Sequence, residues 1–174
     1  MQENQFPPTK HLYGPRWLEI TVIMLAFMVD RASKWWAADF FATHGPTQLH
    51  PYLTITNTYN RGLALGLFQG IAPYMGWLSV LILAILFFYM ITLPAKQSFV
   101  RLGMAITIGG ALGNMIDRIL FGRVLDFIST PFRSGIFNLA DVLIYVGLFT
   151  LFIASFKATS PPSEPTDVLE NSSL

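Results

Sequence analysis

The sequence contains no cysteine, which excludes disulfide bonds, thiol nucleophiles and thiolate metal ligands. Charge is also scarce: 12% of the 174 residues are Asp, Glu, Lys or Arg, whereas soluble domains have about 25%. The chain therefore has too little charge to cover a water-facing surface. Hydrophobic residues make up 53% of it and the mean hydropathy is +0.50, so the composition indicates an integral membrane protein.

Several catalytic and binding motifs are missing as well. The chain has no G-x-S-x-G or H-E-x-x-H motif, no phosphate-binding glycine loop and no basic run. Its three histidines do not have the spacing of metal ligands. With a net charge of +1, the protein is not expected to bind nucleic acid, and we expect it to need neither a metal nor another cofactor.

Four apolar runs predict a mainly α membrane protein with four transmembrane helices. A helix needs about 20 residues to cross a bilayer, and the second run contains 23 uncharged residues. The first helix is expected to end at Trp35 and Trp36, because indole rings favour the membrane interface. Gly109 and Gly113 have the spacing that allows close helix packing. The predicted spans are residues 17–36, 71–93, 99–118 and 136–156.

The segment between the first two spans is not membrane-like. Leu53, Ile55 and Tyr59 alternate with threonines, which is the period of a strand, and Leu63, Leu65 and Leu67 continue a similar alternation. We predict a small β-sheet within residues 47–68, lying on the membrane face. The rest of the chain divides into a polar segment at 1–16, a single membrane-embedded domain at 17–157 and a disordered acidic tail at 158–174.

Four of the ten acidic residues lie in or beside the predicted spans: Asp30, Asp117, Asp126 and Asp141. An ionised side chain at the bilayer centre costs about 2.5–3.5 kcal/mol on insertion scales, so such groups are functional-site candidates by default. Because successive spans run in opposite directions, all four acids are expected to converge at one membrane face, with Asp126 in a loop there. Asp39 is also assigned to a loop.

Polar side chains from the same regions are expected to join these acids. They are Asn60, Asn114, Arg118 and Asn138. On the third span, Asn114 lies three residues before Asp117 and four before Arg118, which places the three side chains on one helical face.

Simpler structural interpretations apply to some of these residues individually. Asn138 and Asp141 have the spacing of an N-cap and the third helical residue, and Asp30 and Lys34 have the spacing of an i,i+4 ion pair. Arg118 is interpreted as a partner of a neighbouring acid that holds the loop. The glycines of the third span are interpreted as helix-packing positions.

With the other catalytic motifs absent, the remaining possibility is catalysis by a pair of carboxyl groups. Two Asp groups held close together cannot both ionise and therefore share a proton. One can accept a proton from water while the other donates to a carbonyl or leaving amine, which is peptide hydrolysis without a covalent intermediate. A small transporter or proton-coupled channel is the main alternative, because intramembrane acids also form proton relays. A non-catalytic scaffold is the third.

Five sequence blocks in this order are similar to those of one family. Residues 30–34 (DRASK) resemble D-x-x-x-K, and 57–64 (NTYNRGLA) resemble a block containing N-x-G-x-A. Residues 109–118 (GGALGNMIDR), 124–127 (VLDF) and 137–141 (FNLAD) resemble G-G-x-x-G-N-x-x-D-R, V-x-D-F and F-N-x-A-D. The chain thus resembles the lipoprotein signal peptidases (signal peptidase II), which are membrane-embedded aspartic proteases of bacteria.

The resemblance implies an aspartic endopeptidase that removes the signal peptide from diacylglyceryl-modified prolipoproteins, cutting before the lipidated lipobox cysteine. The family's catalytic pair falls on Asp126 and Asp141. Its supporting residues fall on Asp30, Lys34, Asn60, Gly62, Asn114, Asp117, Arg118, Asn138 and Ala140.

The resemblance also implies a multi-pass protein of the bacterial inner (cytoplasmic) membrane, with both termini cytoplasmic, an extracytoplasmic sheet and an active site toward the outer leaflet. Lysine and arginine counts alone leave the orientation open, because the two sides carry nearly equal numbers. The expected partners are lipidated prolipoproteins, membrane lipids and globomycin-type peptide inhibitors, and we expect a monomer. Leu63 and Leu65 depart from the family pattern, and the loop from Asp126 to Phe137 is shorter than expected.

Overall fold

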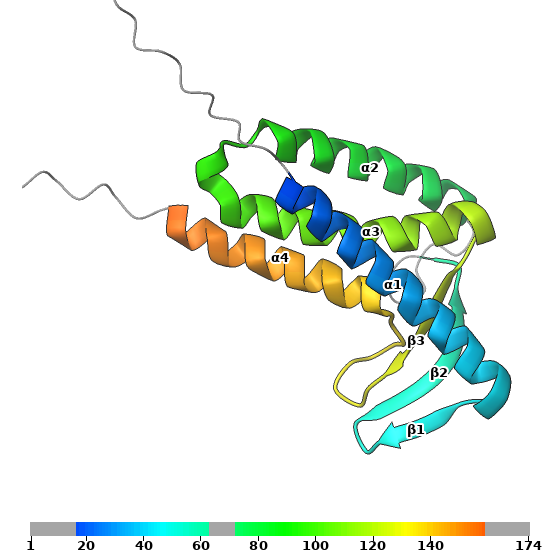
Figure 1. Ribbon diagram of the computed structural model, residues 1–174. Helices are drawn as coiled ribbons and strands as arrows, with labels where there is room; N and C mark the ends of the chain where they lie inside the picture. The colour runs from blue at the N-terminus through cyan, green and yellow to red at the C-terminus, as the bar shows by residue number, and fades with distance from the viewer. Residues whose placement is uncertain (1–16, 63–71, 159–174) are drawn as a thin grey trace, which may run out of the picture.

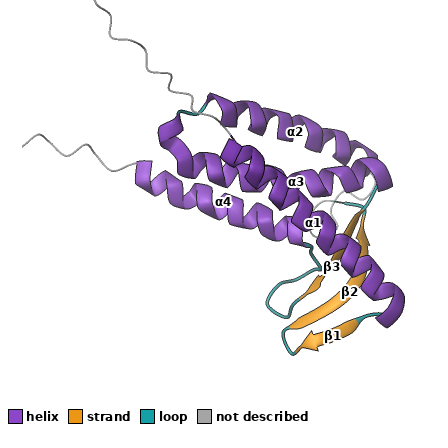
Figure 2. Ribbon diagram, in the orientation of Figure 1, coloured by secondary structure: helices purple, strands orange, loops and turns teal. Residues whose placement is uncertain are grey.

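The computed structural model describes residues 17–62 and 72–158, which form a helical bundle with a small sheet at one end (Figures 1 and 2). The predicted polar segment, the predicted tail and the proposed strand residues Leu63, Leu65 and Leu67 lie outside the described residues. The elements in chain order are α1 (Trp17–His44), β1 (Thr47–His50), β2 (Leu53–Asn60), α2 (Ala72–Thr92), a 3-10 turn (Ala95–Gln97), α3 (Ser98–Phe121), β3 (Val124–Ser129) and α4 (Leu139–Ala158).

The central helix is α3, which packs against α1, α2 and α4 (Figure 1). Small residues allow the close approach. A Cβ added at Gly109 would lie 2.6 Å from the Cβ of Ala26 on α1, and one at Gly110 would lie 2.8 Å from the carbonyl oxygen of Ala140 on α4. The predicted packing role of the glycines on this helix is therefore confirmed.

Three helices in the described ranges are long and apolar enough to cross a membrane: Tyr74–Thr92, Ala95–Phe121 and Leu139–Phe156. The predicted first span is not among them, because α1 carries Glu19, Asp30, Arg31 and Lys34 within its length. Three of the four predicted spans thus coincide with helices that could cross a membrane by length and composition, and the prediction of four spans is not confirmed.

Two predicted helix boundaries are wrong. The first helix does not end at Trp35 and Trp36 but continues to His44, so Asp39 lies on a helix and not in a loop. The last helix begins at Leu139, three residues after the predicted start of the span, because the backbone at Phe137 is bonded to β3. The N–H of Phe137 donates to the carbonyl of Ile128 at 3.0 Å, and the N–H of Ile128 donates back at 2.8 Å.

The sheet is antiparallel and has the order β1-β2-β3. The prediction of a sheet after the first helix is correct for β1 and β2, but the third strand comes from the segment after α3, where a loop carrying Asp126 was expected. Gly122 makes this connection possible, since it ends α3 in the left-handed region (φ +63°) and its N–H donates to the Arg118 carbonyl. Asn60 pairs with Val124 and Thr58 with Asp126, so β2 and β3 bring distant polar residues together.

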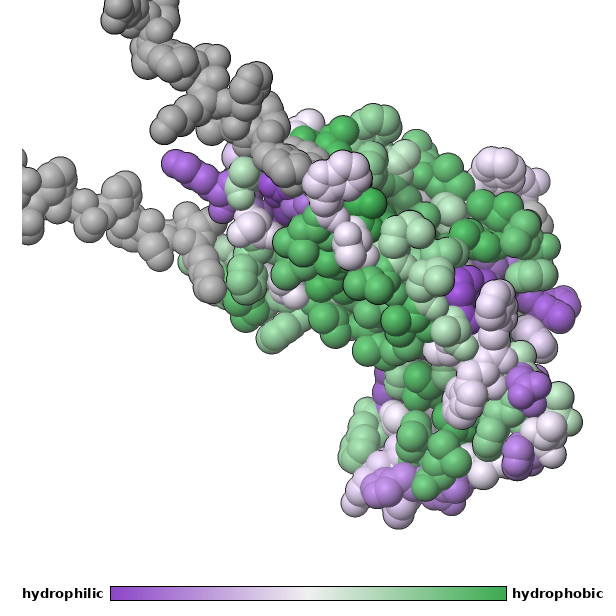
Figure 3. All heavy atoms as spheres, viewed as in Figure 1, coloured by the Kyte–Doolittle hydropathy of each residue, from purple (hydrophilic) through white to green (hydrophobic). Residues whose placement is uncertain are grey.

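Apolar side chains cover most of the helical surface on the face shown in Figure 3, and hydrophilic residues gather where the helices meet the sheet. Among the exposed side chains are Leu25, Met28, Phe88 and Phe149. A surface of this kind is suited to lipid contact. The polar junction is where the candidate site lies.

Candidate active site

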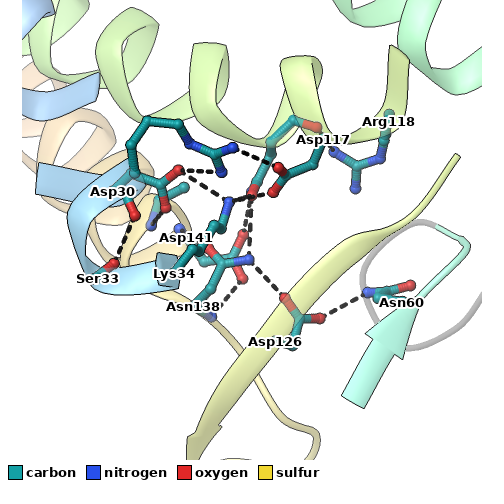
Figure 4. A network of polar contacts seen from close by, with 12 residues as sticks. Asp30, Ser33, Lys34, Asn60, Asp117, Arg118, Asp126, Asn138 and Asp141 are labelled. Atoms are coloured by element: carbon teal, nitrogen blue, oxygen red, sulfur yellow. Dashed lines mark hydrogen bonds and ion pairs between the residues drawn. The ribbon is translucent and has the colours of Figure 1, made fainter. Parts of the chain in front are cut away.

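Asp126 lies on β3 with its side chain pointing into the protein, at 3% exposure. Both carboxylate oxygens accept hydrogen bonds from amide side chains (Figure 4). The Nδ2 of Asn138 donates to Oδ1 at 2.6 Å, and the Nδ2 of Asn60 donates to Oδ2 at 3.1 Å. Asp126 is therefore held between the end of β2 and the residue just before α4.

Asp141 lies in the first turn of α4 and is held by a reciprocal cap. The backbone N–H of Asn138 donates to Oδ2 of Asp141 at 3.2 Å, and the backbone N–H of Asp141 donates to Oδ1 of Asn138 at 3.1 Å. This confirms the predicted N-cap arrangement. A role in helix capping does not exclude a catalytic role for Asp141. The cap holds the Asp141 carboxylate next to Asn138, whose side chain also binds Asp126.

Asn114 of α3 connects the second acid to the rest of the polar network. Its Nδ2 donates to Oδ1 of Asp141 at 2.9 Å, and its Oδ1 accepts from Nζ of Lys34 at 2.8 Å and from Nδ2 of Asn138 at 3.2 Å. The amide orientation of Asn114 is thus determined by a cation on one side and a carboxylate on the other.

A cluster of four charged residues underlies this network. Nζ of Lys34 lies 3.0 Å from Asp30 and 2.7 Å from Asp117, and the guanidinium of Arg31 lies 2.7 Å from Asp117 and 3.2 Å from Asp30. The predicted ion pair between Asp30 and Lys34 is confirmed. Lys34 also reaches Asp117 on α3, so its role extends beyond its own helix.

Asp30 is fully buried and is also tied to the last helix. Its Oδ1 accepts the backbone N–H of Ala140 at 3.1 Å. Gly113 leaves the space for the Asp30 carboxylate, because a Cβ there would lie 2.0 Å from Oδ2. Asp30 therefore connects α1, α3 and α4 at the level of the two candidate catalytic acids.

Arg118 has different partners from those expected. Its guanidinium donates to the backbone carbonyls of Asn114 and Gly62, each at 3.4 Å, whereas Asp117 pairs with Arg31 and Lys34. The predicted pairing of Arg118 with a neighbouring acid is therefore wrong. Gly62 itself is held by Oδ1 of Asn60, which accepts its N–H at 2.9 Å.

Asp126 and Asp141 line one cavity of about 310 Å³, together with Asn60, Asn114, Arg118 and Asn138. Residues 133–136, from the connection between β3 and α4, border it as well. Burial, followed by the nearby charge of Asp141, raises the pKa of Asp126 to about 6, against the lowering effect of the hydrogen bonds from Asn60 and Asn138. A carboxyl with this pKa can hold or release a proton near neutral pH.

A family model described as signal peptidase (SPase) II matches residues 22–157. The chain belongs to the signal peptidase II family. It is 32% identical over 155 residues to a lipoprotein signal peptidase of Shewanella amazonensis, covering 84% of this chain and 90% of that one. It is 34% identical over 159 residues to one of Coxiella burnetii, covering 86% and 92%. Membership of a peptidase family weighs against the transporter and scaffold alternatives.

Solved structures agree with this assignment to signal peptidase II. Two structures of bacterial membrane enzymes align with TM-scores of 0.74 and 0.72, at 30% and 29% identity. The first alignment covers 85% of this chain and 93% of the other, and the second covers 82% and 94%. The protein is thus a multi-pass membrane protein of the peptidase family.

Two arginines at the site were not among the predicted site residues. Arg31 completes the ion cluster, and Arg133 borders the cavity with its guanidinium carbon 4.7 Å from the Phe137 ring centroid and 5.0 Å from that of Tyr145. Asp30 is the acid next to Arg31 in the sequence, and this proximity indicates only a contact between neighbours. Its partner Asp117 is 86 residues away, and no local pattern indicates that pairing.

Proposed function

We propose that the chain removes signal peptides from diacylglyceryl-modified prolipoproteins, hydrolysing the bond before the lipidated lipobox cysteine with Asp126 and Asp141. The observation that carries the proposal is the position of these two acids, which come from β3 and α4 and face the same cavity. The relatives named lipoprotein signal peptidase support the substrate class.

Asp141 is proposed as the general base. Its carboxylate accepts hydrogen bonds from the Asn114 side chain and the Asn138 backbone, and the N-terminal end of α4 favours negative charge. It takes a proton from a water molecule as the water oxygen attacks the scissile carbonyl carbon.

Asp126 is proposed as the general acid. Its raised pKa allows it to hold a proton, which it gives to the carbonyl oxygen as the water attacks. When the tetrahedral intermediate collapses, Asp126 takes that proton back from the hydroxyl group, and the proton that Asp141 took from water goes to the leaving amine. Arg118 borders the same cavity and offers N–H donors to the negative charge that develops on the carbonyl oxygen.

The first helix is proposed as a fourth membrane crossing. Three of the charged residues in its predicted span face the protein, since Glu19, Asp30 and Lys34 are 5%, 0% and 4% exposed. Outward-facing residues such as Met24, Leu25, Met28 and Val29 are apolar and exposed, so lipid would meet a hydrophobic surface. Average hydropathy misses this arrangement because it does not distinguish the two faces of a helix.

Four crossings place the start of α1, the connection from α2 to α3 and the end of α4 at the end of the bundle opposite the sheet (Figure 1). We propose that this end is cytoplasmic and that the sheet and cavity lie at the outer leaflet of the inner membrane. Prolipoprotein and surrounding lipids would reach the cavity from the bilayer. A globomycin-type peptide would inhibit by occupying it, and a monomer suffices because both acids come from one chain.

The test uses purified protein in lipid nanodiscs and a diacylglyceryl-modified lipobox peptide. Asp126→Asn and Asp141→Asn are each expected to lower the cleavage rate at least about 100-fold, because each removes a proton-transfer group. EDTA is expected to have no effect. The matched control is Asp39→Asn, which changes an exposed acid on α1 and should leave the rate unchanged. Clear cleavage by either cavity variant would contradict the proposed pair.

A further inference from the structure

A second cavity of about 310 Å³ lies beside the first and shares no lining residue with it within the described part of the chain. Successive residues of β2 and β3 point to opposite faces of the sheet. Asn60, Val124 and Asp126 therefore line the catalytic cavity, whereas Tyr59, Arg123 and Leu125 line the second one. Helix α3 also lines both cavities, with Asn114 and Arg118 in the first and Asp117 and Phe121 in the second.

The second cavity has an excess of positive charge. Arg31 and Lys34 line it and are balanced by Asp30 and Asp117. Arg123 adds a further cation, which forms no ion pair within the described residues, and its guanidinium carbon lies 3.8 Å from the Tyr59 ring centroid. Among the described residues, the site therefore has one net positive charge and a guanidinium that donates no hydrogen bond.

Exposed aromatic residues surround the cavity. Trp35, Tyr59 and Phe121 all line it and are 74%, 47% and 64% exposed. Trp and Tyr are enriched at the membrane–water interface, and the lining of this cavity joins such rings to charged residues of α1 and α3. An occupant would thus have its polar part among the arginines and an apolar part along Phe121.

We propose that this second cavity binds the phosphodiester headgroup of an anionic phospholipid. The phosphate contacts Arg123, and an acyl chain lies against Phe121 and the outer surface of α3. Basic pockets between membrane helices are suited to such headgroups. The proposal goes beyond the proposed function, because binding requires neither substrate nor catalysis.

The test measures phospholipid binding to the full-length protein by native mass spectrometry from neutral detergent. Phosphatidylglycerol and phosphatidylcholine are titrated separately against wild type, Arg123→Gln and Arg123→Lys. The control is Arg61→Gln, which removes an exposed charge at the end of β2 that lines neither cavity. Thermal unfolding of each variant without lipid shows whether it is folded.

Wild type is expected to prefer phosphatidylglycerol. Arg123→Gln should weaken that binding about five- to tenfold, as expected for the loss of one basic residue near anionic lipid, and leave phosphatidylcholine binding unchanged. Arg123→Lys should recover part of the affinity. Arg61→Gln should bind like wild type.

Three results would overturn the proposal. They are equal binding of the two lipids by wild type, an equal loss in Arg61→Gln and Arg123→Gln, and displacement of phosphatidylglycerol by soluble glycerol phosphate. The last result would assign the cavity to a soluble phosphate ligand instead. None of them bears on peptide cleavage, so failure here is distinguishable from failure of the proposed catalytic pair.

Discussion

Asn138 is the residue that places both candidate catalytic acids. Its Nδ2 donates to Asp126, while its Oδ1 and backbone N–H complete the cap with Asp141. It is completely buried, so no water replaces these bonds. One side chain thereby sets the separation of two carboxylates that come from different elements.

The pKa of Asp126 leads to a prediction about pH. Because its folded value of about 6 exceeds the ordinary 3.8, the folded protein binds this proton more tightly than the unfolded chain does. The associated stabilisation, roughly 3 kcal/mol for this difference, is present below pH 4 and is lost as the pH rises through about 6. Asp141→Asn should lower the pKa of Asp126, because it removes the nearby charge that contributes to the rise.

Infrared titration can measure this pKa through the C=O band of the protonated carboxyl group. Subtracting the spectrum of Asp126→Asn assigns the band, and the midpoint should then be compared between wild type and Asp141→Asn. An unchanged midpoint in the second variant would mean that the two carboxyl groups are not electrostatically coupled.

Contacts between residues close in sequence were predictable, and those between distant residues were predictable only in general terms. The cap between Asn138 and Asp141 and the ion pair between Asp30 and Lys34 follow from spacings of three and four residues. The direction of successive spans predicts that the acids share a membrane face. It does not predict that Asp117 pairs with Arg31, since that choice depends on side-chain packing.

At the scale of elements, the contact between α1 and α3 depends on Gly113. A methyl group there would lie 2.0 Å from Oδ2 of Asp30, a buried oxygen that cannot move without leaving Lys34 and Arg31. Gly113→Ala should therefore destabilise the protein by about 1–3 kcal/mol, the usual cost of overpacking, and reduce cleavage. Thermal unfolding and the peptide assay measure the two effects.

Gly76→Ala on α2 is the matched control. The added Cβ would lie 3.0 Å from Cγ1 of Ile119 and 3.4 Å from its backbone nitrogen, a much smaller overlap than at Gly113, and alanine favours helix by about 1 kcal/mol relative to glycine. This variant should be destabilised less than Gly113→Ala. Equal destabilisation at both glycines would argue against a specific role for the Asp30 contact.

Helices whose side chains are apolar on every face were the easiest elements to predict. The second helix is apolar along its whole length, and its predicted span, 71–93, nearly coincides with Ala72–Thr92. The third strand was missed because its inward face carries an acid: Val124 and Asp126 are 1% and 3% exposed. A polar residue at an inward position removes the alternation by which a strand is normally identified.

At the scale of the whole molecule, the bundle has charged contacts at both ends. Opposite the sheet, Glu19 of α1 forms an ion pair with Arg101 of α3, and the two side chains are 5% and 4% exposed. Breaking such a pair leaves a buried charge without a partner, whereas replacing both residues by apolar ones removes that cost.

Glu19→Gln should therefore lower the stability by about 3–5 kcal/mol. The double variant Glu19→Leu/Arg101→Leu should be at least as stable as wild type, because neither residue then carries a charge. Thermal unfolding in detergent compares the three proteins. A single variant as stable as wild type would mean that the pair contributes little to the assembly of α1 with α3.

The distribution of charge on α1 has a consequence for biosynthesis. Glu19 has its partner Arg101 on α3. Arg31 and Lys34 share Asp30 on their own helix but also bond to α3, and the bond from Lys34 to Asn114 joins residues 80 positions apart. While the ribosome is still translating the segment before α3, Glu19 has no partner there and two cations share one acid, and incompletely paired charges in a bilayer are costly. In the proposed topology with four crossings, the first helix therefore reaches its final depth only after the third has emerged, so its insertion completes late although its synthesis comes first.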